Sequence, residues 1–237
     1  MVAEQLIDFK AAVDKEMAAG ASVKVAVMKT LKPLIAEIID TVCFDGNGYA
    51  EEWPEEALKR GLDIERCVPK MFLENVKPEA VAMFEKLGVF TAAELEARNE
   101  VKFETYIKLV QIEARVLGDL AINHIIPAAT TYQSTLLKNV AMMKNLFPVQ
   151  WEEMASHELC IIKKIASYNA TIKTKVDEMV QKRKVANKLE DGYEKAILYY
   201  EIAESFNAIR KPIDKLEEIV DDNIWPMPKY RELLWIR

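Results

Sequence analysis

The sequence contains little glycine and almost no histidine. Only 7 of its 237 residues are glycine, and residues with high helix propensity dominate, which predicts an all-α protein. The two histidines are His124 and His157, and the residues three positions before them are Ala121 and Met154. The paired Glu-x-x-His motifs of di-metal carboxylate bundles are therefore absent from this chain.

The sequence also lacks an excess of basic charge and any long apolar run. The net charge is −6 and the isoelectric point is near 5.3, which argues against nucleic acid as a partner. The short basic run at 182–184 is expected to lie on a solvated helix face. No apolar run approaches the roughly 18 residues that a membrane-spanning helix needs, so we expect no membrane partner.

Cysteine is scarce, and no common catalytic motif occurs. Cys43, Cys67 and Cys160 have no paired spacing, and the first residues form an amphipathic pattern without an apolar signal core. We therefore expect reduced thiols and a cytoplasmic location. Cys160 and His157 lie three residues apart with no sign of a pocket, and no Rossmann, Walker or zinc-binding pattern is present. We predict no catalytic, cofactor-binding or metal-binding residue in this chain.

A tight turn is predicted at residues 44–49, Phe-Asp-Gly-Asn-Gly-Tyr, with residues at positive φ. Asp45, Asn47 and Glu56 match positions 1, 3 and 12 of a calcium-binding loop, but position 6, which requires glycine, is Ala50. We therefore interpret this segment as a structural turn.

The most prominent feature is a long helical pattern over residues 91–145. Thr91 and Glu94 have the spacing of a capping box at its start. Two neighbouring apolar stripes predict that this helix packs against two others. The first consists of Phe103, Ile107, Val110, Ala114, Leu117 and Ala121, and the second of Tyr106, Leu109, Ile112, Val116 and Leu120. Pro127 predicts a kink.

Asn123 and His124 continue these stripes just before Pro127. One interpretation is a polar site at the kink. The other, which we favour, is structural: the two side chains pair with carbonyl groups that Pro127 leaves free and with a neighbouring helix.

Other helices are predicted on both sides of this one. The earlier helices cover about 3–18, with residues 6, 9, 12, 13 and 17 on one face, then 22–38, capped by Ser22 with a kink or restart expected at Pro33, and shorter segments at 54–60 and 78–87. Two long helices follow, one over about 149–188 and one over 196–220 that Pro212 should bend. We therefore expect an elongated antiparallel bundle of three long helices with a smaller irregular helical N-terminal part.

The predicted organisation has three parts within what we expect to be one domain. Residues 1–90 form the N-terminal helical segment, 91–221 the long-helix bundle, and 222–237 a tail rich in proline and aromatic residues. We expect this tail to leave the bundle and dock on another surface.

Several motifs in this order resemble the C-terminal helical region of type III glutamine synthetase, from about residue 21 to the end. They lie at 44–49, 52–53, 59–62, 88–91, 94–95, 97–98, 111–115, 123–129, 132–133, 215–217, 221–222, 225–226 and 228–234. The segment 45–48 reads Asp-Gly-Asn-Gly where the family is expected to have Asn-Gly-Asp-Gly, a change that keeps the turn chemistry.

The resemblance implies a part of an ATP-dependent glutamate–ammonia ligase. That family uses Mg²⁺ or Mn²⁺ ions held by Glu and His on a β-stranded half, and the motifs matched here belong to the helical extension. The resemblance therefore implies a structural, oligomer-building module that is inactive alone and carries no cofactor itself. Its partners would be the catalytic half or copies of itself. The alternative is a free-standing helical interaction or regulatory protein.

Overall fold

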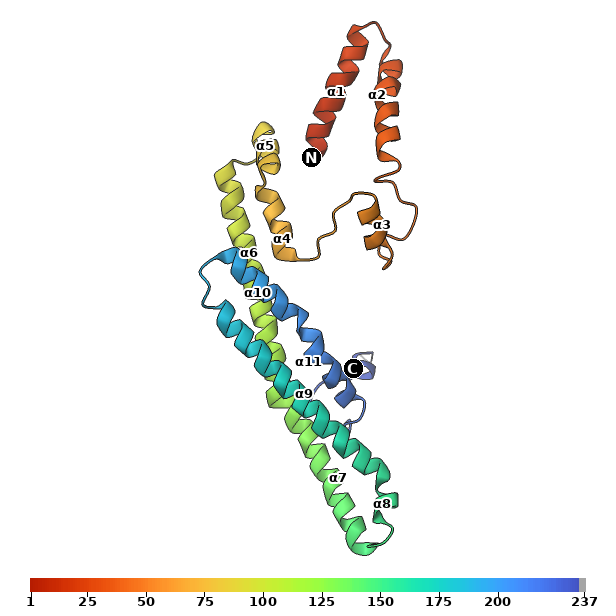
Figure 1. Ribbon diagram of the computed structural model, residues 1–237, viewed down its shortest axis with the longest axis vertical. Coiled ribbons are helices and arrows are strands. Elements are labelled where there is room, and N and C mark those ends of the chain that lie inside the picture. Colours follow the sequence, from red (N-terminus) through yellow and green to blue (C-terminus); the bar gives the residue numbers. More distant parts are fainter. Residues whose placement is uncertain (235–237) are drawn as a thin grey trace. The chain divides into compact units, whose positions relative to one another are not determined.

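The computed structural model describes residues 1–234, and all regular secondary structure in this range is helical (Figure 1). The predicted all-α class is confirmed. Contacts divide the chain into two compact units, one from Met1 to Lys102 and one that begins at Phe103. The boundaries that the sequence suggested, at residues 90 and 221, stay a prediction.

The first unit consists of short helices and the beginning of a long one. Its elements are α1 (Val2–Ala18), α2 (Val23–Ile38), α3 (Trp53–Lys59), α4 (Val68–Leu73), η1 (Glu74–Val76), α5 (Pro78–Lys86) and the first turns of α6 (Ala92–Asp119). Helix α1 ends at Ala18, and Gly20 just beyond it has a φ of 95°, a backbone conformation that residues with a side chain disfavour. The N-cap of α2 is Ser22, but its side chain makes no capping hydrogen bond, and the helix continues through Pro33 to Ile38. The predicted N-cap position of Ser22 is confirmed, but without a hydrogen bond from the side chain, and the restart expected at Pro33 does not occur.

The turn at residues 44–49 depends on Gly46 for space rather than for backbone freedom. Positive φ occurs at other glycines and not in this turn, so that part of the prediction is wrong. A Cβ atom at Gly46 would lie 2.2 Å from Cζ of Phe44. The Phe44 ring itself packs on Trp53, with 4.5 Å between ring centroids, and the Arg60 guanidinium lies 5.3 Å from its centre. The close approach of the Phe44 ring to the backbone explains why residue 46 is glycine.

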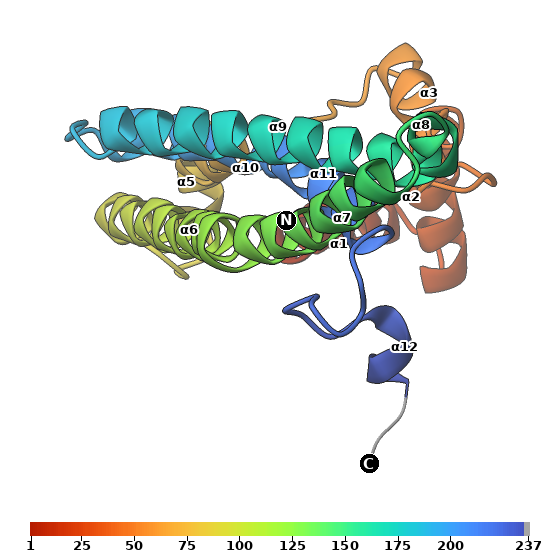
Figure 2. The ribbon, with the colours of Figure 1, turned by 90° about the horizontal axis from the view of Figure 1, so that it is seen from below.

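The second unit is a bundle built around α9. Its elements after α6 are η2 (Leu120–Ile125), α7 (Ile126–Leu146), α8 (Trp151–Met154), α9 (Ser156–Ala186), α10 (Gly192–Glu204), α11 (Phe206–Glu217) and α12 (Tyr230–Leu233). Helix α9 runs back along α7 and also packs against α10 and α11 (Figures 1 and 2). The core side chains of α9 include Ile165, Ile172, Val176 and Met179. The predicted antiparallel arrangement of long helices is present in this unit.

The irregularity expected near Pro127 is a π-helical segment, η2. Proline has no N–H group, and its ring collides with the preceding turn of a regular α-helix. In η2 the N–H group of Ile126 donates to the carbonyl of Ala121, five residues earlier. The wider π turn accommodates the proline while α6, η2 and α7 remain one continuous helix.

Only one of the two apolar stripes on α6 is buried. Phe103, Val110 and Ala114 belong to the core, as predicted, whereas the second stripe is largely solvent-exposed. Its members Leu109, Ile112 and Val116 are 57%, 58% and 51% exposed. The prediction that both stripes pack against helices of this chain is wrong for the second.

The third long helix is interrupted at Ser205 and not at Pro212. The Ser205 hydroxyl donates to the Ile202 carbonyl over 2.6 Å, and its N–H group donates to the same carbonyl over 3.1 Å. This local pairing competes with the α-helical pattern and separates α10 from α11. Pro212 lies buried within α11, which continues past it.

The first part of the C-terminal tail folds back on the bundle. Trp225 is 8% exposed. The Lys229 ammonium donates to the Glu217 carbonyl over 2.8 Å and pairs with the Asp222 carboxylate. The prediction that the tail leaves the bundle is wrong for this part, and residues 235–237 of the predicted tail lie outside the described residues.

Candidate docking surface

Residues 1–234 contain no cluster of three or more His, Cys, Asp or Glu side chains that could hold a metal ion. Within the same range, no helix has the length and apolar character to cross a membrane. The three cysteines are free thiols, with Cys43 and Cys160 exposed and Cys67 buried.

Asn123 and His124 lie on the surface beside the π segment. The Asn123 amide donates to the Asp119 carboxylate over 2.6 Å, and Nε2 of His124 lies 4.0 Å from the same carboxylate. Both residues are exposed, so the favoured prediction of buried pairing with carbonyl groups is wrong. A π turn contains more residues than an α turn, and a stripe drawn with α-helical spacing therefore fails there.

The hairpin of α1 and α2 exposes large apolar side chains on several faces. Only Val13 and Ala26 are buried in these two helices. Several large aliphatic residues are between 44% and 76% exposed: Val2, Leu6, Ile7, Val25, Met28, Ile35 and Ile38. The sequence pattern had placed residues 6 and 17 of the first helix on a packed face, but both are exposed. Exposed large apolar side chains that gather on two adjacent helices are typical of an interaction site.

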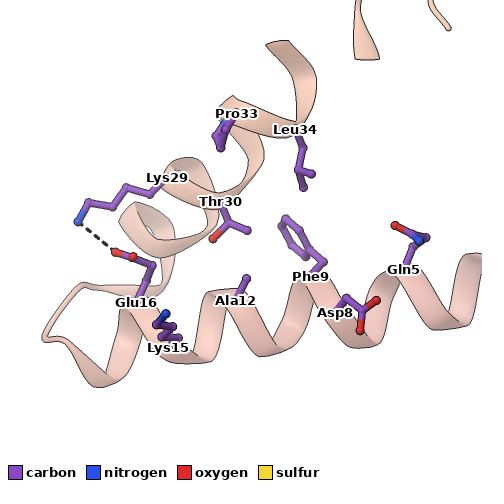
Figure 3. Close-up of a pocket in the computed structure, with 10 residues that line it drawn as sticks. All are labelled: Gln5, Asp8, Phe9, Ala12, Lys15, Glu16, Lys29, Thr30, Pro33 and Leu34. Carbon is purple, nitrogen blue, oxygen red and sulfur yellow. Dashed lines mark hydrogen bonds and ion pairs between the residues drawn. The ribbon is translucent and has the colours of Figure 1, made fainter. Parts of the chain in front are cut away.

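A groove of about 450 Å³ lies between the two helices (Figure 3). Its apolar lining comes from Phe9, Ala12, Pro33 and Leu34. The Phe9 ring points from α1 toward α2, and the two helices diverge from their connecting turn (Figures 1 and 3).

Charged side chains surround this apolar lining. Near the turn, the Lys29 ammonium lies 3.2 Å from the Glu16 carboxylate, across the two helices. Asp8 lies 3.9 Å from Lys86 of α5, whereas Lys15 forms no ion pair within the described part of the chain. The groove therefore combines an apolar floor with a rim on which the Lys15 ammonium has no ion pair among residues 1–234.

A second groove of about 670 Å³ lies beside the start of α6, in the same unit. The rings of Phe84 and Phe90 line it with 5.7 Å between their centroids, and the Arg98 guanidinium lies 4.4 Å above Phe90. The predicted capping box is confirmed here: the Thr91 N–H group donates to Glu94 over 2.9 Å, and the Glu94 N–H group donates to the Thr91 hydroxyl over 3.3 Å. The Thr91 N–H bond lowers the pKa of Glu94.

The fold and surface define an all-α domain whose first unit presents apolar helices and grooves to solvent. Its sequence matches the glutamine synthetase C-terminal domain over residues 26–144, and the chain belongs to that family. The resemblance recognised from the motifs is thereby confirmed.

The similar proteins are much longer than this chain. The chain is 42% identical over 238 residues to the glutamine synthetase of Bacteroides fragilis (strain YCH46), and 29% identical over 242 residues to the type-3 glutamine synthetase of Dictyostelium discoideum. Both similarities cover 100% of this chain and 32% of the relative. A glutamine synthetase of Butyrivibrio fibrisolvens is 27% identical over 82% of the chain. The chain thus spans about a third of the length of the curated relatives it matches.

Proposed function

We propose that this chain is the C-terminal structural module of a glutamine synthetase and packs against the part of the enzyme that performs catalysis. The observation that carries the proposal is that the whole chain aligns with about a third of two full-length relatives named glutamine synthetase. The exposed apolar hairpin supports it, because the remaining two-thirds of such an enzyme would supply a surface to cover these residues.

The proposal also assigns a role to each part of such an enzyme. In this proposal, ATP-dependent joining of glutamate and ammonia, with its Mg²⁺ or Mn²⁺ ions, takes place in the other part of the enzyme, in the cytoplasm. The module contributes apolar packing area and helps to build the oligomer.

The energetics favour a covered hairpin. Two helices with only two buried residues gain little from their own packing, and helices of 16 or 17 residues are marginal in isolation. Burial of one exposed Leu, Ile or Val side chain contributes about 1.5–3 kcal/mol when it is complete. The partly exposed residues of α1 and α2 can therefore supply a substantial driving force for docking.

A chimera tests this function. This chain would replace the matched segment of the Bacteroides fragilis enzyme, and ATP-dependent glutamine formation would be measured for the chimera, for the parent enzyme and for this chain alone. We expect activity in the parent and the chimera and none in the isolated chain. Turnover by the isolated chain equal to that of the parent would overturn the proposal, as would an inactive chimera that is folded and assembled like the parent.

A further inference from the structure

We propose that the groove between α1 and α2 receives an amphipathic helix from the part of the polypeptide that lies outside this chain, which completes a three-helix bundle. This inference rests on the proposed function and names the surface that performs it. It concerns the groove lined by Phe9, Ala12 and Leu34 (Figure 3).

The backbone of the hairpin determines what kind of segment can bind. Residues 2–18 and 23–38 are α-helical, so their N–H and C=O groups are bonded within the helices apart from the termini. Within residues 1–38 there is no sheet edge to which an extended strand could add. Recognition must use side chains, and the usual partner for a groove between two helices is a third helix whose apolar ridge fits into it.

The dimensions of the groove suit a short helix. Its lining residues on α1 run from Gln5 to Glu16, a distance of about 16 Å at 1.5 Å per residue. This length corresponds to about three helical turns. The divergence of α1 and α2 away from their turn leaves the groove open at the end opposite the Lys29–Glu16 pair.

The residues that line the groove predict how apolar and charged side chains are arranged along the helix that occupies it. Apolar residues spaced three and four apart would contact Phe9 and Leu34. A carboxylate beside that stripe would face Lys15, the rim cation without an ion pair in the described residues. The occupant is therefore an acidic amphipathic helix rather than a uniformly apolar one.

We assign the occupant to the remainder of the same polypeptide because that remainder is long and because it is covalently connected to the groove. The relatives contain about twice as much chain outside the matched part as within it, since the match covers 32% of each. A covalently connected helix has a high effective concentration at the groove, which a separate molecule does not have.

The test uses the chimera with a specific protease site placed at the junction before this chain. After cleavage, size-exclusion chromatography measures whether the segment stays bound to the rest of the enzyme. We expect the unmodified segment to stay bound and Leu34→Glu to weaken binding at least about tenfold, because a buried carboxylate without a partner is costly. The matched control is Val25→Glu on the same helix; Leu34 and Val25 are 42% and 49% exposed, but Val25 does not line the groove.

Each outcome of the cleavage experiment bears on the groove. Retention of the Leu34→Glu segment, or equal release of the Val25→Glu segment, would refute the groove as the docking site while chimera activity still supported the proposed function. Release of the unmodified segment would also refute it. Circular dichroism of the released segments would verify that both variants remain helical.

A photo-crosslinker identifies the occupant directly. Lys15→p-benzoylphenylalanine places the reactive group on the groove rim, and mass spectrometry of the uncut chimera maps the attached peptides. We expect attachment outside this chain, at positions three or four residues apart in one acidic amphipathic segment. Attachment only between two copies of this chain, or only to an extended segment, would overturn the proposal.

Discussion

Tyr199 offers a sharp test of the packing in the second unit. It is a fully buried side chain at 0% exposure, on α10. Its hydroxyl donates to Oδ1 of Asn187 over 2.7 Å, at the end of α9. The side chain of Gln111, on α6, also hydrogen-bonds this hydroxyl. Tyr199→Phe keeps the ring and removes the hydroxyl, so the change tests one small polar contact between helices.

The size of the effect follows from the surroundings of the acceptor. A typical intramolecular hydrogen bond contributes about 0.5–1.5 kcal/mol net. Asn187 is exposed, so its oxygen regains water in the variant and no orphaned acceptor adds to the loss. We therefore expect Tyr199→Phe to lower the free energy of unfolding by about 1 kcal/mol near pH 8.

The same substitution predicts a pH dependence. Burial raises the pKa of Tyr199 above its ordinary value of 10.0. The folded state therefore holds the proton more tightly than the unfolded state, and this contribution to stability is complete below pH 10 and is lost as the pH rises through the folded-state pKa. Phenylalanine has no such proton. The stability difference between the wild type and Tyr199→Phe should therefore narrow above pH 10.

Urea unfolding followed by circular dichroism at pH 8 and at pH 10.5 measures both effects. Tyr49→Phe is the matched control, because Tyr49 is 100% exposed and its substitution should change stability little at either pH. A difference between wild type and Tyr199→Phe that stays constant or widens at the higher pH would refute the reasoning. So would a variant that is more stable than the wild type at pH 8.

For three further substitutions, the structure determines whether the folding stability rises or falls. Gly118→Ala should stabilise the chain by about 0.5–1 kcal/mol, because alanine favours the helix and its Cβ would lie 3.4 Å from the flexible end of Met179; a lower urea midpoint would contradict this. Asn169→Leu should raise stability by about 1 kcal/mol, because it removes a buried amide oxygen that has no partner among the described residues and loses only one long hydrogen bond, 3.4 Å from Nδ2 to the Thr130 hydroxyl. A fall in melting temperature would contradict this. Thr91→Ala should cost about 1 kcal/mol through loss of the cap, measured by urea unfolding at pH 7. Because the pKa of Glu94 is lowered, its capping contribution should be present above its ordinary pKa and disappear as the pH falls through the lowered value, and an acid titration that shows no loss would contradict this.

Much of the fold could be predicted from local patterns. The capping box of Thr91 and Glu94 and the buried stripe that includes Phe103 and Val110 were correct. These signals are reliable because they depend on residues within one or two turns of the same helix. The family was recognisable for a similar reason, since its motifs are short segments in a characteristic order.

The exposed surface could not be predicted by the same reasoning. The stripe of Leu109, Ile112 and Val116 has the spacing of a packed face, yet it faces solvent in this chain. Periodicity shows that a face is apolar and does not show which molecule covers it. The signal that could have identified the candidate surface was the occurrence of apolar residues on more than one side of residues 2–18 and 23–38.

The amino-acid sequence by itself determined the all-α class, the position of the long helix and the family, because helix propensity, capping and apolar spacing act over a few residues. Only the tertiary structure decided that the Pro127 region forms a π segment that leaves Asn123 and His124 on the surface, and that α10 ends at Ser205. It also decided which apolar residues line the groove between α1 and α2. The π segment and the break at Ser205 are local changes in backbone hydrogen bonding that the spacing of apolar residues does not reveal. The lining of the groove depends on how two helices pack together, and the packing energy of many contacts outweighs the local preference of any one residue.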